Sequence, residues 1–204
     1  MREAWNKVIY KIWAPVYDRF FNAGIFRKAR MELFQENKIQ NRDQVLLVGV
    51  GTGADLEYIH HTTQSITAID FSPEMLQKAK EKYPNSSIQF LEMDAQNMSF
   101  DDHSFDVVIG SLILSVVPDP GQCFQEMERV LKPEGQIIIF DKFISHKRNH
   151  FTLQQLFRPV IKVLGTDVGL SFEELYQKHR HDIAIEEDKP MMLAGMYRKI
   201  ILRK

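Results

Sequence analysis

Three glycines and two aspartates are spaced as in a nucleotide-binding site. The glycines form the run Gly49-Val50-Gly51-Thr52-Gly53, and such a run lets the backbone pass close to a ligand before a sharp turn. Asp70 follows Gly49 by about 20 residues, the spacing expected of an acid that accepts hydrogen bonds from ribose hydroxyls. Asp94-Ala95 offers a carboxylate acceptor beside a backbone N–H, which suits the edge of adenine.

The glycine spacing alone does not identify the nucleotide. Gly49, Gly51 and Ala54 also satisfy the loose dinucleotide pattern G-x-G-x-x-A, so an NAD-dependent oxidoreductase is an alternative. The Asp94-Ala95 pair and the lack of a second substrate domain count against that alternative.

Short apolar runs bounded by turn residues must carry these groups. Each is too short for a typical helix, and nearly continuous apolarity predicts strands that are buried on both faces. The runs span residues 44–50, 65–70, 87–94, 105–111 and 135–141. Helices are predicted between them, at residues 73–83 after Ser72-Pro73 and at residues 121–132 after Asp119-Pro120. Alternating strands and helices predict a doubly wound α/β fold with a mostly parallel sheet.

The last part of the chain predicts a different kind of pairing. Residues 184–187 and 196–203 read as two strands, which we expect to form an antiparallel edge of the sheet. The length of 204 residues fits a single domain.

Composition excludes several classes of protein. Lys+Arg 26 against Asp+Glu 27 gives a net charge of -1, which argues against a strongly basic nucleic-acid-binding surface. The single cysteine, Cys123, excludes an internal disulfide framework and a cysteine-based zinc cluster, so no metal site is predicted. No secretory signal or membrane-spanning run is evident, and we expect a cytoplasmic protein, with peripheral membrane contact as an alternative.

Four motifs in order resemble the class I S-adenosylmethionine-dependent methyltransferases. They are VLLVGVGTG, AIDFSPEMLQKAK, FLEMDAQNMSFDDHSFDVVIGS and VPDPGQCFQEMERVLKPEGQIIIFD. The likeness is greatest to the branch that includes quinone and phospholipid methylases, and bacterial phospholipid N-methyltransferases above all. It implies a seven-stranded Rossmann-like methyltransferase fold and S-adenosyl-L-methionine as the cofactor, with S-adenosyl-L-homocysteine as the product.

The resemblance also implies a role for each site residue. The Gly49–Gly53 loop would wrap the methionine part of the cofactor, and Asp70 would bind the ribose. Phe71 and Met75 would flank the adenine, whose edge Asp94-Ala95 would read. Ser111 would approach the methionine end of the cofactor, and Tyr17, in a segment similar to the family's Tyr-Asp signature, would cap that end.

Two positions depart from the family pattern. Leu47 stands where the family usually has an acid that helps to hold the methionine amino group, and Glu134 replaces the second glycine of an LKPGG turn. A relative that binds the cofactor without catalysis is therefore a further alternative.

The segments on either side of the core are expected to set acceptor specificity. We divide the chain into a helical lid at 1–40, a cofactor-binding core at 41–145 and acceptor-side helices with the terminal strands at 146–204. Trp5, Ile9 and Trp13 lie on one apolar helical face with Lys7 and Lys11 outside it, which suits either packing on the sheet or contact with a lipid surface.

The predicted acceptor is an apolar or amphipathic small molecule. A phospholipid amine is the first choice, and a quinone ring or a small thiol is the second. An amine needs only to be unprotonated, so no catalytic base is assigned. The candidates for a base are Asp141, Lys142, His146, His150, His179 and His181.

Overall fold

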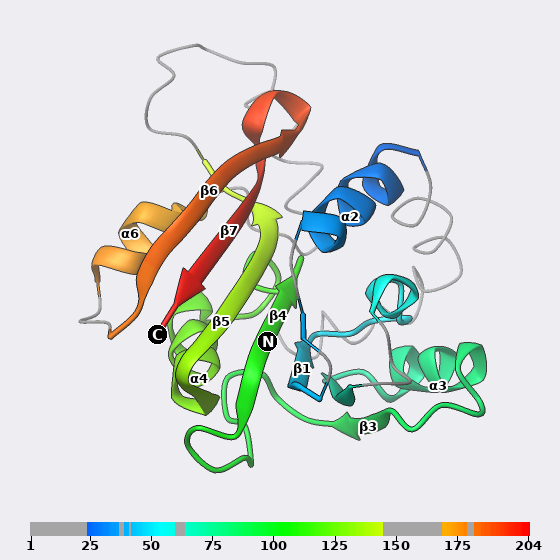
Figure 1. The fold of residues 1–204 in the computed structure, drawn as a ribbon. Coiled ribbons are helices and arrows are strands. Elements are labelled where there is room, and N and C mark those ends of the chain that lie inside the picture. The colour runs from blue at the N-terminus through cyan, green and yellow to red at the C-terminus, as the bar shows by residue number, and fades with distance from the viewer. Residues whose placement is uncertain (1–23, 37–38, 41, 60–63, 145–168, 179–181) are drawn as a thin grey trace.

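A seven-stranded sheet forms the centre of the molecule (Figure 1). The computed structural model describes residues 24–36, 39–40, 42–59, 64–144, 169–178 and 182–204. The strands are β1 (Gln44–Val48), β2 (Ser65–Asp70), β3 (Gln89–Glu92), β4 (Phe105–Ser111), β5 (Leu131–Lys142), β6 (Ala184–Met192) and β7 (Tyr197–Arg203). Their order across the sheet is β3-β2-β1-β4-β5-β7-β6. The pairs from β3 to β5 are parallel, and β7 is antiparallel to both of its neighbours. The predicted fold class is confirmed.

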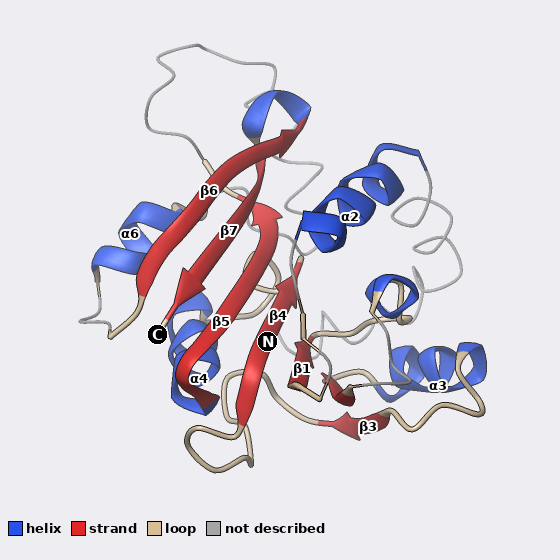
Figure 2. Ribbon diagram, viewed as in Figure 1, coloured by secondary structure: helices blue, strands red, loops and turns tan. Residues whose placement is uncertain are grey.

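Helices cover both faces of this sheet, which gives three layers (Figure 2). They are α2 (Gly24–Glu36), α3 (Pro73–Lys82), α4 (Pro120–Val130) and α6 (Phe172–Gln177), with 3-10 turns η1 (Asp55–Tyr58) and η2 (Leu193–Gly195). Helices α4 and α6 share one apolar core with one face of the sheet. Elements α2, η1 and α3 share a second core with the other face.

Local sequence explains where the central elements begin. The hydroxyl of Ser72 accepts a hydrogen bond from the N–H of Met75, and the carboxylate of Asp119 accepts one from the N–H of Gln122. Both caps precede a proline at the start of a helix, as predicted. Strands β1 and β4 are buried along nearly their whole length, as expected of strands covered on both faces.

Strand β5 begins earlier than predicted, at Leu131 rather than Gly135. The LKPEG segment pairs with β4 through Leu131 and Phe105, and an irregular register follows before Gln136 meets Val107. Glu134 has a φ of 63°, a conformation that favours glycine, at the position where related sequences have glycine. The turn therefore keeps its backbone shape without its usual residue.

Helix α2 is the described part of the segment predicted as a lid, and it packs against the sheet. Its Leu33 is fully buried, and the Phe26 ring meets the Tyr197 ring edge-on at 5.3 Å. Residues 1–23 lie outside the described part of the chain. No helix within the described ranges is long and apolar enough to cross a membrane.

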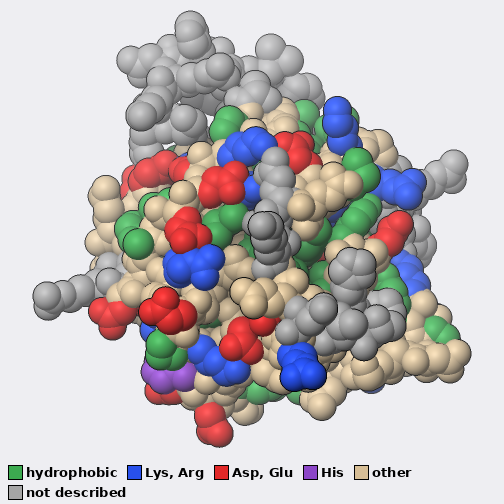
Figure 3. Space-filling model, in the orientation of Figure 1, with side chains coloured by type: hydrophobic (Ala, Val, Ile, Leu, Met, Phe, Trp, Pro, Cys, Tyr) green, Lys and Arg blue, Asp and Glu red, His purple; other side chains and the backbone are tan. Residues whose placement is uncertain are grey.

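Strand β6 is charged and forms one edge of the sheet. It pairs through β7 with the rest of the sheet, and ion pairs link Glu186 to Arg203 and Glu187 to Lys199. Acidic and basic side chains alternate on this part of the surface (Figure 3). Charges of this kind discourage another strand from adding to an edge.

Candidate cofactor site

A cavity lies at the carboxyl ends of the parallel strands, where the strand order reverses between β1 and β4. Open α/β sheets bind their ligands at this place. It encloses about 940 Å³ of empty space, part of which is open to solvent. Its lining includes these predicted site residues: Gly49, Gly51, Asp70, Phe71, Met75, Asp94, Ala95 and Ser111.

Three other predicted residues that the structure describes do not line this cavity. Val50 and Thr52 are buried, and Gly53 lies on the outer side of the loop, where its carbonyl accepts a hydrogen bond from the Tyr83 hydroxyl at 3.2 Å. Tyr17 lies outside the described residues.

Asp70 joins the end of β2 to the glycine loop. Its Oδ2 accepts the N–H of Gly51 at 2.7 Å, and its Oδ1 accepts the N–H of Ser72 at 2.9 Å. Burial raises the pKa of the Asp70 carboxyl, although these hydrogen bonds oppose the rise. Each carboxylate oxygen can accept more than one hydrogen bond, so both can also receive ligand hydroxyls.

The glycines of the loop have different steric surroundings. A Cβ added to Gly49 would lie 2.5 Å from Cδ1 of Ile113, so this position admits no side chain without repacking. A Cβ at Gly51 would meet no atom of the described residues within 4 Å beyond its chain neighbours, and the φ of Gly51 is 56°. Among the described residues the space at Gly51 is therefore open, which fits a loop that closes on a ligand.

Two polar atoms of the cavity have no protein partner within the described ranges. The Oγ of Ser111 is buried and has no hydrogen bond. The Oδ1 of Asp94 accepts the backbone N–H and the side-chain amide of Gln96, whereas its Oδ2 accepts nothing from the described residues. A buried polar atom without a partner, such as the Ser111 Oγ, indicates that a polar ligand group or a water molecule meets it in the cavity.

One wall of the cavity is apolar. It comes from the loop after β4 and consists of Leu112, Ile113, Val116, Val117 and Pro118. Leu112 has a φ of 58°, an unfavourable conformation for leucine, and its N–H donates to the carbonyl of Phe140 at 2.7 Å. The cavity can therefore hold a polar nucleoside on one side and an apolar group on the other.

The described base candidates lie behind this wall. Asp141 is fully buried and does not line the cavity. Its Oδ2 accepts a hydrogen bond from the N–H of Ser115 at 3.1 Å, and its Oδ1 accepts one from the N–H of Lys142 at 2.8 Å. Burial raises the pKa of Asp141. Its position makes it a support for the β4–α4 loop. The four histidine candidates all lie outside the described residues.

Two residues that were not predicted to bind the cofactor also matter for the site. Gln96 lines the cavity and contacts Asp94, and only its place in the turn after Asp94 could have indicated this. Leu47, where the family usually has an acid, is buried in β1 on the side of the sheet that faces α2. No carboxylate therefore stands at that position.

Comparison with known proteins identifies the family of the chain. Residues 46–139 match the family model of the methyltransferase domain. A phosphatidylethanolamine N-methyltransferase from Cereibacter sphaeroides is 31% identical over 92% of this chain and 92% of its own length. A demethylmenaquinone methyltransferase from Listeria monocytogenes is 31% identical over 85% of this chain and 76% of its own. A crystal structure of a SAM-dependent methyltransferase from Thermotoga maritima superposes with a TM-score of 0.72 at 19% identity, covering 98% of this chain and 99% of that one.

The fold and the cavity are those of an α/β enzyme that binds its ligand at the carboxyl ends of the strands. The chain belongs to the class I S-adenosylmethionine-dependent methyltransferases. It is an enzyme that uses S-adenosylmethionine. None of the relatives described above is an oxidoreductase, so the nicotinamide alternative has no support.

Proposed function

We propose that the acceptor is the amino group of a phospholipid, which this enzyme converts to a methylated amine. The observation that carries the proposal is the end-to-end match to a phosphatidylethanolamine N-methyltransferase, which extends well beyond the cofactor core. The apolar wall formed by the β4–α4 loop gives lipid-like groups a surface beside the cofactor.

We assign the cofactor contacts as follows. The carboxylate of Asp70 accepts the ribose hydroxyls, Phe71 and Met75 flank the adenine, and Asp94-Ala95 reads its edge. The methionine end lies along the Gly49–Gly53 loop, with Ser111 beside it. Supporting this assignment, Asp70 and Asp94 both line the cavity, and the Ser111 hydroxyl has no partner among the described residues.

The protein's task in this reaction is mainly to position the reactants. When bound, the cofactor supplies an activated methyl group on a sulfonium. The neutral amine nitrogen forms a bond to that methyl carbon while the carbon–sulfur bond breaks, the electron pair stays on sulfur, and the amine proton passes to solvent. Alignment of this kind can contribute about 7–11 kcal/mol to the lowering of the barrier.

A quinone ring is the second candidate acceptor. Demethylmenaquinone methyltransferases match most of this chain at the same identity as the phospholipid enzyme. Carbon methylation of a ring benefits from a base. No such group is assigned among the described residues that line the cavity.

Transfer of a labelled methyl group from S-adenosylmethionine tests the choice directly. We expect label in the lipid fraction with phosphatidylethanolamine vesicles, and none with phosphatidylcholine vesicles, whose nitrogen is already fully methylated. The Asp70→Ala variant provides the control for cofactor dependence. Label in demethylmenaquinone but not in phosphatidylethanolamine would reverse the order of the candidates, and label in neither would reject both.

We also propose that residues 1–21 close over the site and contact the lipid surface. The support is the sequence pattern of an apolar face with Trp5 and Trp13 beside Lys7 and Lys11. The protein should sediment with anionic vesicles at low salt, and Lys7→Glu with Lys11→Glu should release it. The control variant is Lys80→Glu with Lys178→Glu, which makes the same charge change at two exposed lysines, one on α3 and one at the end of α6. This variant should still sediment with the vesicles. Absence of vesicle binding by the unmodified protein would reject this contact.

A further inference from the structure

We infer that Gln96 is a positioning residue that makes the site selective for adenine, by holding Asp94 so that one carboxylate oxygen is free for the 6-amino group. The inference rests on the proposed adenosine-binding role of this cavity. It adds to that role a residue that acts through Asp94 on the base.

The contacts of Gln96 fix the orientation of its amide. Its Oε1 accepts the backbone N–H of Asp119 at 2.8 Å, so its Nε2 is the atom that meets Asp94. Asp119 begins α4, and its own carboxylate caps that helix. The Gln96 side chain therefore ties the turn after β3 to the rigid start of α4.

This arrangement occupies one oxygen of Asp94 and leaves the other. The Oδ1 of Asp94 accepts two hydrogen bonds from Gln96, one from the backbone N–H at 2.9 Å and one from the side-chain Nε2 at 3.0 Å. These two bonds use both lone pairs of Oδ1. The Oδ2 accepts no hydrogen bond from the described part of the chain and belongs to a residue of the cavity wall. An ionised carboxylate oxygen accepts but cannot donate, so the position selects a ligand group that donates.

Adenine presents such a donor, and a purine without the 6-amino group does not. A hydrogen bond to a charged group is worth roughly 10- to 150-fold in affinity. Loss of the Gln96 side-chain amide would leave only the backbone N–H of residue 96 on Asp94 Oδ1, which holds the carboxylate less firmly. Selectivity for the amino group would then fall more than affinity for the rest of the ligand.

Calorimetry with two probes tests the inference: S-adenosylhomocysteine and its analogue that lacks the 6-amino group. In the unmodified protein we expect the adenosyl compound to bind at least 10-fold more tightly. Gln96→Met should reduce this ratio at least threefold, and Asp94→Ala should abolish it. Affinity for the analogue should change less than twofold in Gln96→Met.

Gln77→Met is the matched control. The Gln77 amide also donates to a carboxylate, that of Glu81 at 2.9 Å, but it lies on the exposed face of α3. In this variant the ratio of the affinities for the two probes should stay at the value of the unmodified protein. Gln96→Glu, measured at pH 8, is a second variant. It keeps an acceptor for the N–H of Asp119, removes the donor to Asp94 and adds a second negative charge beside Asp94; it too should lower the ratio.

The possible results separate the inference from the proposed function. An unchanged ratio in both Gln96 variants would overturn the positioning role while the cofactor assignment stands. Equal binding of the two probes by the unmodified protein would also overturn it. Failure of S-adenosylhomocysteine to bind at all would reject the proposed site, and the inference with it.

Discussion

Both oxygens of the Asp70 carboxylate are already engaged by the backbone, through Gly51 and Ser72. The same side chain is proposed to accept the ribose hydroxyls, so it shapes the glycine loop and binds the ligand at once. Asp70→Ala should therefore weaken S-adenosylhomocysteine binding by about 2–4 kcal/mol, roughly 30- to 1000-fold, measured by calorimetry. The exposed Asp101→Ala should leave affinity unchanged. An unaltered affinity in Asp70→Ala would remove this residue from the site.

The raised pKa of Asp70 makes a second prediction, about pH. Burial raises this pKa, so the carboxylate takes up a proton at a higher pH than an ordinary aspartate does. A protonated carboxyl is a poorer acceptor for ribose hydroxyls. Affinity for S-adenosylhomocysteine should be highest above the raised pKa and should fall as the pH drops through it. A titration of affinity against pH checks this, and a flat profile down to pH 4 would contradict it.

Sequence alone could identify residues of the site whose chemistry is distinctive. Asp70 and Asp94 follow predicted strands, and strands of a parallel sheet bring their carboxyl ends to one edge. Gln96 and Asp141 could not be assigned in this way. An amide that holds a neighbour, and a buried carboxyl that supports a loop, are recognised only from their partners.

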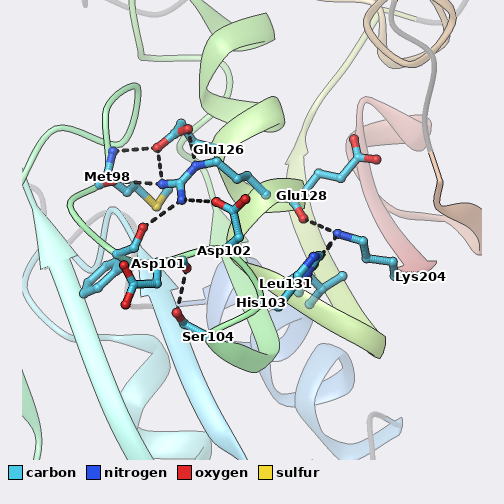
Figure 4. Close-up of polar contacts among 11 residues, drawn as sticks. Met98, Asp101, Asp102, His103, Ser104, Glu126, Glu128, Leu131 and Lys204 are labelled. Carbon is cyan, nitrogen blue, oxygen red and sulfur yellow. Dashed lines mark hydrogen bonds and ion pairs between the residues drawn. The ribbon is translucent and has the colours of Figure 1, made fainter.

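Helix α4 is joined to the loop between β3 and β4 by Arg129. Figure 4 shows Glu126 of this helix beside Met98 of that loop. Its guanidinium donates to the Glu126 carboxylate, to the carbonyls of Met98 and Phe100, and to Asp102. The hydrogen bond from Arg129 lowers the pKa of Glu126, which also accepts the N–H of Met98 at 2.7 Å. This network fixes the loop that begins with Asp94 and Ala95.

Arg129→Met should destabilise the protein by about 2–4 kcal/mol in urea unfolding, because Glu126 would remain buried without its partner. Arg27→Met is the control, since Arg27 and Glu57 form an exposed pair at 3.5 Å that should contribute only about 0–1 kcal/mol.

The lowered pKa of Glu126 means that its pair with Arg129 stabilises the fold above the unfolded-state pKa and that this stabilisation is lost as pH falls through the folded-state pKa. The difference between Arg129→Met and the unmodified protein should therefore shrink in acid.

The elements that sequence predicts well are those with strong local signals. The caps at Ser72 and Asp119 predict the starts of α3 and α4 correctly. Helix α4 ends at Val130 rather than at Lys132, because Leu131 and Lys132 already belong to β5. Strand β6 was predicted only to Glu187 but continues to Met192. This extension depends on pairing with β7; for example, Lys189 pairs with Lys199. A charged segment has no periodic apolar pattern that would predict such a strand.

At the scale of the whole molecule, the sheet order depends on contacts between distant segments. The pair of terminal strands was predicted, but nothing local shows that β7 lies between β5 and β6 rather than at the edge. Packing decides it. Ile200 and Leu202 of β7 are fully buried in the core under α4 and α6, whereas none of the nine residues of β6 is buried and four of them are charged.

Binding of the cofactor product should stabilise this whole fold. A ligand that binds only the folded state at 100 times its Kd adds about 2.7 kcal/mol. For a chain of this size that corresponds to a rise in Tm of roughly 5–10 °C. Thermal unfolding should show this rise with S-adenosylhomocysteine and none with NADH. In Asp70→Ala, at the same ligand concentration, a 30-fold weaker Kd leaves only about 0.8 kcal/mol, so the rise should fall below about 3 °C. A rise with NADH alone would instead favour a dinucleotide, despite the methyltransferase relatives.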